Sequence, residues 1–117
     1  MQAGRYDFSI KQGSTFEKAF TFKHDDGTPH DLTGFDIKMQ IREDYNSSPL
    51  LELTTINGKI TYIDESEGHF KIRLSPNDTK NLTFCQAVYD LDIYDIDNKY
   101  TILEGVVKLI REVTRNV

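Results

Sequence analysis

Four aspartates between positions 90 and 97 are spaced closely enough to suggest a calcium site. Calcium takes about six to eight oxygen ligands, usually from a loop that turns sharply at a glycine. An extended strand here would place Asp90 and Asp92 on its outer face, and Asp97 falls in the turn that follows. The spacing and closing glutamate of an EF-hand loop are missing. The sequence therefore favours a solvated outer face for the set, which comprises Asp90, Asp92, Asp95 and Asp97.

The three histidines, His24, His30 and His69, are the other residues that could ligate a metal. A zinc site needs several His, Cys or carboxylate ligands held close together. The chain has one cysteine and no His-x-x-x-His spacing. We interpret the histidines as surface residues at the ends of strands, and we expect no metal site.

Cys85, the single cysteine, lies between Phe84 and Gln86, just before an apolar segment. A nucleophilic cysteine needs a positively charged environment and a nearby base. The apolar context instead predicts a small buried hydrophobe. The sequence also shows no glycine-rich phosphate loop and no catalytic triad signature. We therefore expect no catalytic residues, no cofactor and no enzyme activity.

The composition is that of one acidic, well-solvated domain. The 117 residues, 38% hydrophobic and 28% charged, suit a single domain over residues 1–117. A net charge of −5 argues against nucleic acid or an anionic membrane as a partner, because both favour a basic surface. No apolar segment is long enough to span a bilayer, and the residues after Arg5 do not read as a signal peptide. A small-molecule ligand is not indicated.

Short segments of alternating polarity, separated by turn residues, must position these side chains. This pattern predicts an all-β fold, an immunoglobulin-like antiparallel β-sandwich of about eight strands. Short connections favour mostly antiparallel pairing, since parallel pairing would need helical crossovers for which the chain has no room. The expected strands cover residues 6–11, 15–23, 35–42, 50–56, 59–63, 69–75, 86–96 and 100–111.

Two local signals stand out among the turns. Asn57-Gly58 lies between two alternating runs, which predicts a tight hairpin. Residues 76–82 predict a short helical turn. Ser75 can cap it, Pro76 suits the first helical position, and Asp78 favours the positive end of the helix.

Two residues interrupt otherwise regular rows. Lys18 falls in the row of Phe16 and Phe20 on the second expected strand, where an apolar residue is expected. Gly105 lies inside the last strand, where it indicates either a bulge or a close backbone approach. We favour the bulge, because it needs no partner.

The last expected strand is the candidate for a protein interface. Val106 and Ile110 are apolar on what should be its outer row. Tyr94 and Tyr100 are expected to be exposed in acidic surroundings, which suits protein contacts better than base stacking. The unpaired edge strands of a small sandwich are further docking sites.

Seven short phrases follow one another along the chain in a distinctive order. They are residues 8–16, 31–35, 38–42, 51–55 before Asn57-Gly58, 88–91, 103–105 and 112–115. Their order resembles that of a known family of small virion-associated proteins of tailed bacteriophages. The chain is distantly similar to the immunoglobulin-like N-terminal domain of phage baseplate upper proteins.

This resemblance implies a β-sandwich with a non-enzymatic structural or adaptor role in the particle, and it supplies no catalytic residues. The tail or baseplate is the favoured place, and head decoration is an alternative. The implied partners are other virion proteins and further copies of the chain. The protein would be made in the cytoplasm of the bacterial host. A second hypothesis is a carbohydrate-binding module for host surface glycans, in which Tyr45, Tyr94 and Tyr100 would stack on sugars.

Overall fold

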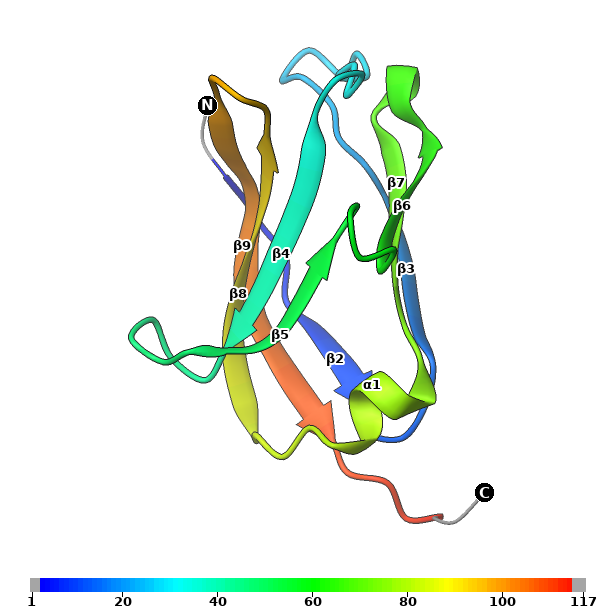
Figure 1. Cartoon of the computed structure of the whole chain (residues 1–117), viewed down its shortest axis with the longest axis vertical. Helices are drawn as coiled ribbons and strands as arrows, with labels where there is room; N and C mark the ends of the chain where they lie inside the picture. The colour runs from blue at the N-terminus through cyan, green and yellow to red at the C-terminus, as the bar shows by residue number, and fades with distance from the viewer. Residues whose placement is uncertain (1–2, 115–117) are drawn as a thin grey trace.

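The computed structural model describes residues 3–114, so Met1, Gln2 and residues 115–117, including Arg115 of the last phrase above, lie outside the described part. Two β-sheets face each other around one hydrophobic core (Figure 1). No helix within residues 3–114 is long and apolar enough to cross a membrane. The elements are β1 (Gly4–Arg5), β2 (Phe8–Lys11), β3 (Phe16–Thr21), β4 (Asp36–Arg42), β5 (Pro49–Thr54), β6 (Ile60–Asp64), the 3-10 helix η1 (Glu65–Glu67), β7 (His69–Leu74), the helix α1 (Pro76–Lys80), β8 (Gln86–Tyr94) and β9 (Lys99–Ile110).

The order of the strands confirms the predicted fold class. The first sheet has the order β1-β9-β8-β4-β5, with β2 also paired to β9, and the second sheet has the order β3-β7-β6. In an immunoglobulin sandwich, β3, β6 and β7 correspond to strands B, D and E, and β4, β5, β8 and β9 correspond to C, C′, F and G. The first sheet is therefore the larger of the two faces.

The first and last strands pair in parallel, which the sequence analysis did not expect. Phe8 lies opposite Val107, and Lys11 lies opposite Ile110. Gly4 and Leu103 pair in the same direction. Parallel neighbours need a long connection, and here that connection is the whole domain between β2 and β9. No separate helical crossover is required, so a chain of this length can hold a parallel pair; the other strand pairs are antiparallel, as expected.

Asn57-Gly58 does not form the predicted hairpin. The strand before it, β5, pairs with β4, whereas the strand after it, β6, pairs with β7 in the other sheet. The Asn57 side chain accepts the N–H groups of Thr54 and Lys59, each at 3.0 Å, and donates to the Glu52 carbonyl at 3.0 Å. The turn thus satisfies its own polar groups without a strand ladder. It carries the chain from one sheet to the other.

The predicted inward rows form the core. Phe70, Ile72 and Leu74 of β7 are buried, as are Val107 and Leu109 of β9. The β4 row behaves in the same way, since side chains with a period of two alternate between the faces of a strand. Its buried members are Ile37, Met39 and Ile41.

Lys18 interrupts its row but stays exposed, with its ammonium beside the ring of Tyr6. The Lys18 ammonium lies 5.6 Å from the centre of the Tyr6 ring, an attractive cation–π geometry. The Tyr6 ring packs edge-on against Phe20 at 5.7 Å. The segment between β1 and β2 therefore supplies the aromatic surface that position 18 does not.

Gly105 marks a close backbone approach, and the prediction of a bulge at this residue is wrong. The bulge lies at Ile102, because Leu91 pairs with Leu103 and Asp92 pairs with Thr101. A Cβ built on Gly105 would lie 2.7 Å from Asp7 Oδ1 and closer still to the Tyr6 carbonyl oxygen. The strand that begins at β1 and continues as β2 crosses Gly105 at this point.

The predicted helical turn is present as α1, and its capping can be tested. The Ser75 hydroxyl accepts the Asp78 N–H at 3.2 Å, and the Asp78 carboxylate accepts the Ser75 N–H at 2.8 Å.

Ser75→Ala removes the bond that the Ser75 hydroxyl accepts from the Asp78 N–H. We expect it to lower the free energy of unfolding in urea by about 1 kcal/mol. Asn77→Ala changes an exposed residue of the same helix and should have almost no effect; equal losses from the two variants would contradict the capping role.

Candidate interaction face

The outer face of the first sheet carries two of the predicted interface residues. Val106 of β9 lies opposite Val88 of β8, and both are half-buried. Ile110, near the end of β9, is 49% exposed. Neither Val106 nor Ile110 belongs to the core, so the predicted outward row is correct. Val88 was missed from the sequence, because its place beside Val106 follows from the register between β8 and β9.

The two tyrosines do not join this valine pair. Tyr94 lies at the far end of β8, opposite Asp36 and about 20 Å along the strand from Val88. Its ring is 5.7 Å from the Lys38 ammonium. Tyr100 lies opposite the buried Ile93, so its row faces the interior, although it is 39% exposed at the end of the sheet. The four predicted residues therefore do not form one patch.

A row of carboxylates crosses the same face beside the valine pair. Glu104 of β9 lies directly opposite Asp90 of β8, an unfavourable pairing of like charges. The row continues through Gln40, whose amide donates to Glu52 at 2.6 Å. Burial raises the pKa of Asp90 above its ordinary value, and the nearby charges of Asp92 and Glu104 raise it further. We call Glu104, Asp90 and Glu52 the acidic row.

Asp92 is buried, which contradicts the expectation of a solvated aspartate set. Only 8% of the residue is exposed. Its Oδ1 accepts the Thr101 hydroxyl at 2.6 Å, and its Oδ2 lies 3.4 Å from the Lys99 ammonium. These partners, supplied by β9, compensate the carboxylate for lost water. Asp92 is therefore part of the packing between two strands.

The remaining aspartates of the set serve the turn between β8 and β9. The Asp95 carboxylate accepts the N–H groups of Asp97 and Asn98 at 2.9 and 2.7 Å. Such bonds stabilise tight turns. Within residues 3–114, no group of three or more His, Cys, Asp or Glu side chains is placed to hold a metal ion.

A shallow polar hollow of about 500 Å³ opens on this face and is lined in part by Asp90 and Glu104 of the acidic row. Tyr45, on the loop between β4 and β5, is 85% exposed at the hollow. Arg42 donates to the Ser47 carbonyl and, at 2.7 Å, to Gln40 Oε1. The hollow combines an exposed ring with charged and amide groups. Its strand residues are Lys38, Gln40, Arg42, Val88, Tyr89, Asp90, Asp92, Lys99 and Glu104.

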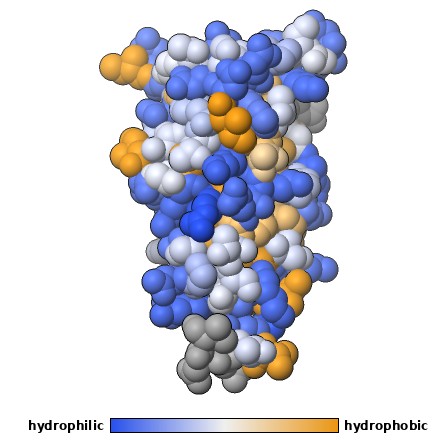
Figure 2. Space-filling model, turned by 90° about the vertical axis from the view of Figure 1, so that its right-hand side faces the viewer, coloured by the Kyte–Doolittle hydropathy of each residue, from blue (hydrophilic) through white to orange (hydrophobic). Residues whose placement is uncertain are grey.

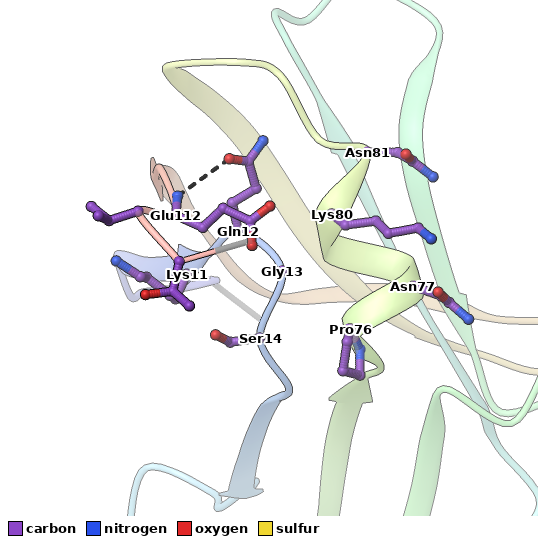
Figure 3. A pocket seen from close by; sticks show the side chains of 11 residues that line it. Lys11, Gln12, Gly13, Ser14, Pro76, Asn77, Lys80, Asn81 and Glu112 are labelled. Carbon is purple, nitrogen blue, oxygen red and sulfur yellow. Dashed lines mark hydrogen bonds between the residues drawn. The ribbon is translucent and has the colours of Figure 1, made fainter. Parts of the chain in front are cut away.

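A second hollow lies between the end of β2 and α1 (Figure 3). Its buried polar side chain is Gln12, whose amide donates to the Leu82 carbonyl at 2.8 Å and accepts the Glu112 N–H at 3.3 Å. These two bonds tie the end of β2 to the segments that follow α1 and β9. Gln12 therefore has a structural role here and does not point to a ligand.

The three histidines lie at two separate places in the fold. The rings of His24 and His30 are 4.6 Å apart across the turn after β3, and Phe22 stacks on His30 at 4.9 Å. His69 begins β7, opposite Thr21 of β3. His24 is exposed and His30 is half-buried, both in the segment between β3 and β4, whereas only the half-buried His69 lies at a strand end as expected.

Cys85 is exposed, and the prediction of a buried cysteine is wrong. Leu82 and Phe84 occupy the inward positions of this segment and are both buried. The alternation therefore turns Cys85 outward just before β8 begins. Its carbonyl accepts the Leu109 N–H at 3.2 Å, so the backbone remains paired with β9.

The opposite side of the sandwich offers a different surface. Figure 2 views the side of the second sheet and shows mostly hydrophilic residues, with hydrophobic residues in scattered spots rather than one broad patch. On that sheet, Glu17 forms ion pairs with Lys71 at 3.3 Å and Arg73 at 3.5 Å. These three charges are thus paired with one another on the second sheet.

The raised pKa of Asp90 gives a test of the acidic row. An aspartate whose pKa is higher in the folded state destabilises the fold at neutral pH; this penalty shrinks as pH falls through the folded pKa and is gone only below the ordinary, unfolded pKa. Asp90→Asn should therefore stabilise the protein at pH 7, toward the lower end of about 0.2–1 kcal/mol because solvent screens the charge. Urea unfolding of both proteins at pH 7 and in acid measures this gain. A gain that persists after Asp90 is protonated would contradict the electrostatic cause.

No protein-family model matches the chain, and a comparison with curated proteins finds no similar sequence.

Proposed function

We propose that this chain is a non-enzymatic structural or adaptor component of a tailed-bacteriophage particle that acts through protein–protein contacts. The observation that carries the contact role is the outer face of the first sheet. There Val88, Val106 and Ile110 are apolar residues outside the core, next to the acidic row, whose carboxylates form no ion pair within residues 3–114. Burying apolar groups and supplying opposite charges is what a protein partner does. The assignment to a phage particle rests on the sequence resemblance.

Mass spectrometry of purified particles tests this proposal. Tailed phage is purified from a culture that produces this chain, and peptides of the chain are quantified against those of the major capsid protein. We expect a fixed copy number per particle that survives repeated purification. An abundant cytoplasmic protein of the host sets the level of contamination. A signal no higher than that level would overturn the proposal, and separated tails and heads would locate the chain.

A second candidate function, glycan binding, is favoured by the polar hollow at Tyr45. Sugars are bound by exposed aromatic rings beside hydrogen-bonding side chains, and Tyr45 adjoins Gln40 and Asp90 in this hollow. A glycan array probed with the monomeric protein tests this function. Binding that is lost in Tyr45→Ala and kept in Tyr100→Ala would support it. An array with no binding would exclude it for the glycans displayed.

A further inference from the structure

The charges on either side of Val106 are opposite in sign. A second copy with its strands reversed would therefore place each charge opposite its counterion. Glu104 and Lys108 lie two residues before and after Val106 on the outer row of β9, each about 7 Å away along the strand. Both side chains are exposed, and neither forms an ion pair within residues 3–114. On β8, Asp90 and Gln86 flank Val88 in the same way. Along β8 and β9, a negative pair, an apolar pair and a positive or neutral pair therefore follow one another. Arg5 of β1 lies beside Glu104, and Arg42 of β4, opposite Val88, is bonded to the Ser47 carbonyl and to Gln40.

We propose that two copies of this chain associate face to face through the outer surface of the first sheet, about a two-fold axis along the row of Val88 and Val106. Such an axis reverses the strand direction of the second copy. Glu104 of each copy then faces Lys108 of the other, and the valines face their equivalents. In a two-fold interface every contact occurs twice. The pairing goes beyond the proposed function, because it depends only on this face and not on the particle.

The arrangement supplies what the isolated face lacks. The acidic row gains a lysine from the partner, which offsets the like-charge contact between Glu104 and Asp90. Gln86 of the partner faces Asp90 and can donate a hydrogen bond to its carboxylate. The valines leave water. Because sheets twist, contact is closest at β8 and β9 and opens toward the edge strands.

The size of the face sets the expected affinity. Five strand positions about 4.8 Å apart and about seven residues long give roughly 550 Å² of flat area. That is less than the about 800 Å² per partner of a standard interface. We therefore expect a weak dimer that forms only at high protein concentration.

Glu104 and Lys108 have little direct effect on each other within one copy, although Glu104 also lies opposite Asp90 and beside Arg5. Glu104 and Lys108 are about 13 Å apart along β9, which exceeds the Debye length of about 8 Å at physiological salt. The register neighbours of Lys108 within the chain are Ser9 and Gln86, which are uncharged. If each single charge reversal weakens association and the double reversal restores it, the two charges must therefore meet between copies.

Sedimentation velocity over a range of concentrations tests the proposal through a charge exchange. We expect the wild-type protein to move from monomer to dimer. Glu104→Lys and Lys108→Glu should each weaken the dimer by at least about tenfold, because each places like charges in two symmetric contacts. The double variant E104K/K108E exchanges the charges and should recover most of the wild-type affinity.

The controls separate charge placement from other effects. Lys23→Glu makes the same change of net charge as Lys108→Glu at an exposed site next to the second sheet, and it should leave the dimer unchanged. Urea unfolding of every variant confirms that it is folded. A wild-type protein that stays monomeric at millimolar concentration would overturn the proposal, as would a double variant that is no tighter than the single ones. Neither outcome would bear on whether the chain is found in phage particles.

Discussion

Phe70→Ala should remove about 3–5 kcal/mol from the free energy of unfolding. Phe70 is fully buried on the central strand of the second sheet, and its ring stacks on Phe20 with centroids 5.6 Å apart. The substitution removes a whole ring between two sheets that cannot close around the cavity. The loss is a large part of the about 5–15 kcal/mol that stabilises a typical domain. Urea unfolding followed by circular dichroism measures it.

Ile96→Ala is the matched control for this prediction. Ile96 lies in the turn between β8 and β9 and is 98% exposed, so its truncation should change stability by less than about 0.5 kcal/mol. If Phe70→Ala abolishes the folded state, Phe70→Leu provides a smaller loss that can still be measured. Similar stabilities for Phe70→Ala and the wild type would contradict the packing of the two sheets.

Gly105→Ala should destabilise the protein by about 1–3 kcal/mol or more, a large effect for one methyl group. The new Cβ would lie 2.7 Å from Asp7 Oδ1 and would overlap the backbone of Tyr6. The chain between β1 and β2 must then move away from β9. That movement breaks the bond from the Tyr89 hydroxyl to the Tyr6 carbonyl and the 2.8 Å bond from the Val106 N–H to Asp7. Urea unfolding measures the loss.

Gly4→Ala makes the same chemical change on the neighbouring strand. A Cβ at Gly4 would meet Leu103 Cδ2 at 3.5 Å, which is an ordinary contact. We expect this variant to be close to neutral. Hydrogen exchange of the β2 amides adds a local readout, since Gly105→Ala should release them and Gly4→Ala should not. Equal losses of stability would show that the crossing at Gly105 is not the cause.

The sequence was a sound guide to which side of each strand faces inward. The rows of β4 and β7 could be predicted because a period of two decides the face of every residue. The cap of α1 could be predicted because its residues interact within one turn. Both features are set locally, by residues that are close in sequence.

Features that depend on distant contacts were not predictable in this way. The turn chemistry of Asn57-Gly58 is satisfied equally well by a hairpin or by a change of sheet. Burial of Asp92 depends on Thr101, which reaches it because of the bulge at Ile102. On the candidate face, Val106 was visible as an outward apolar residue. Its pairing with Val88 required the register of two strands.

The parallel pairing of β2 with β9 has a mechanical consequence. β1 begins near one end of the long axis of the domain, which is 44 Å in extent, and β9 finishes near the other end (Figure 1). Tension applied at Gly4 and Ile110 would therefore slide β2 along β9 in shear. All hydrogen bonds of the ladder from Phe8 to Lys11 would then bear the load at the same time. A pull perpendicular to the strands would instead break such bonds one after another. Resistance to stretching is governed by the rate of unfolding rather than by equilibrium stability, and this geometry slows forced unfolding along that axis.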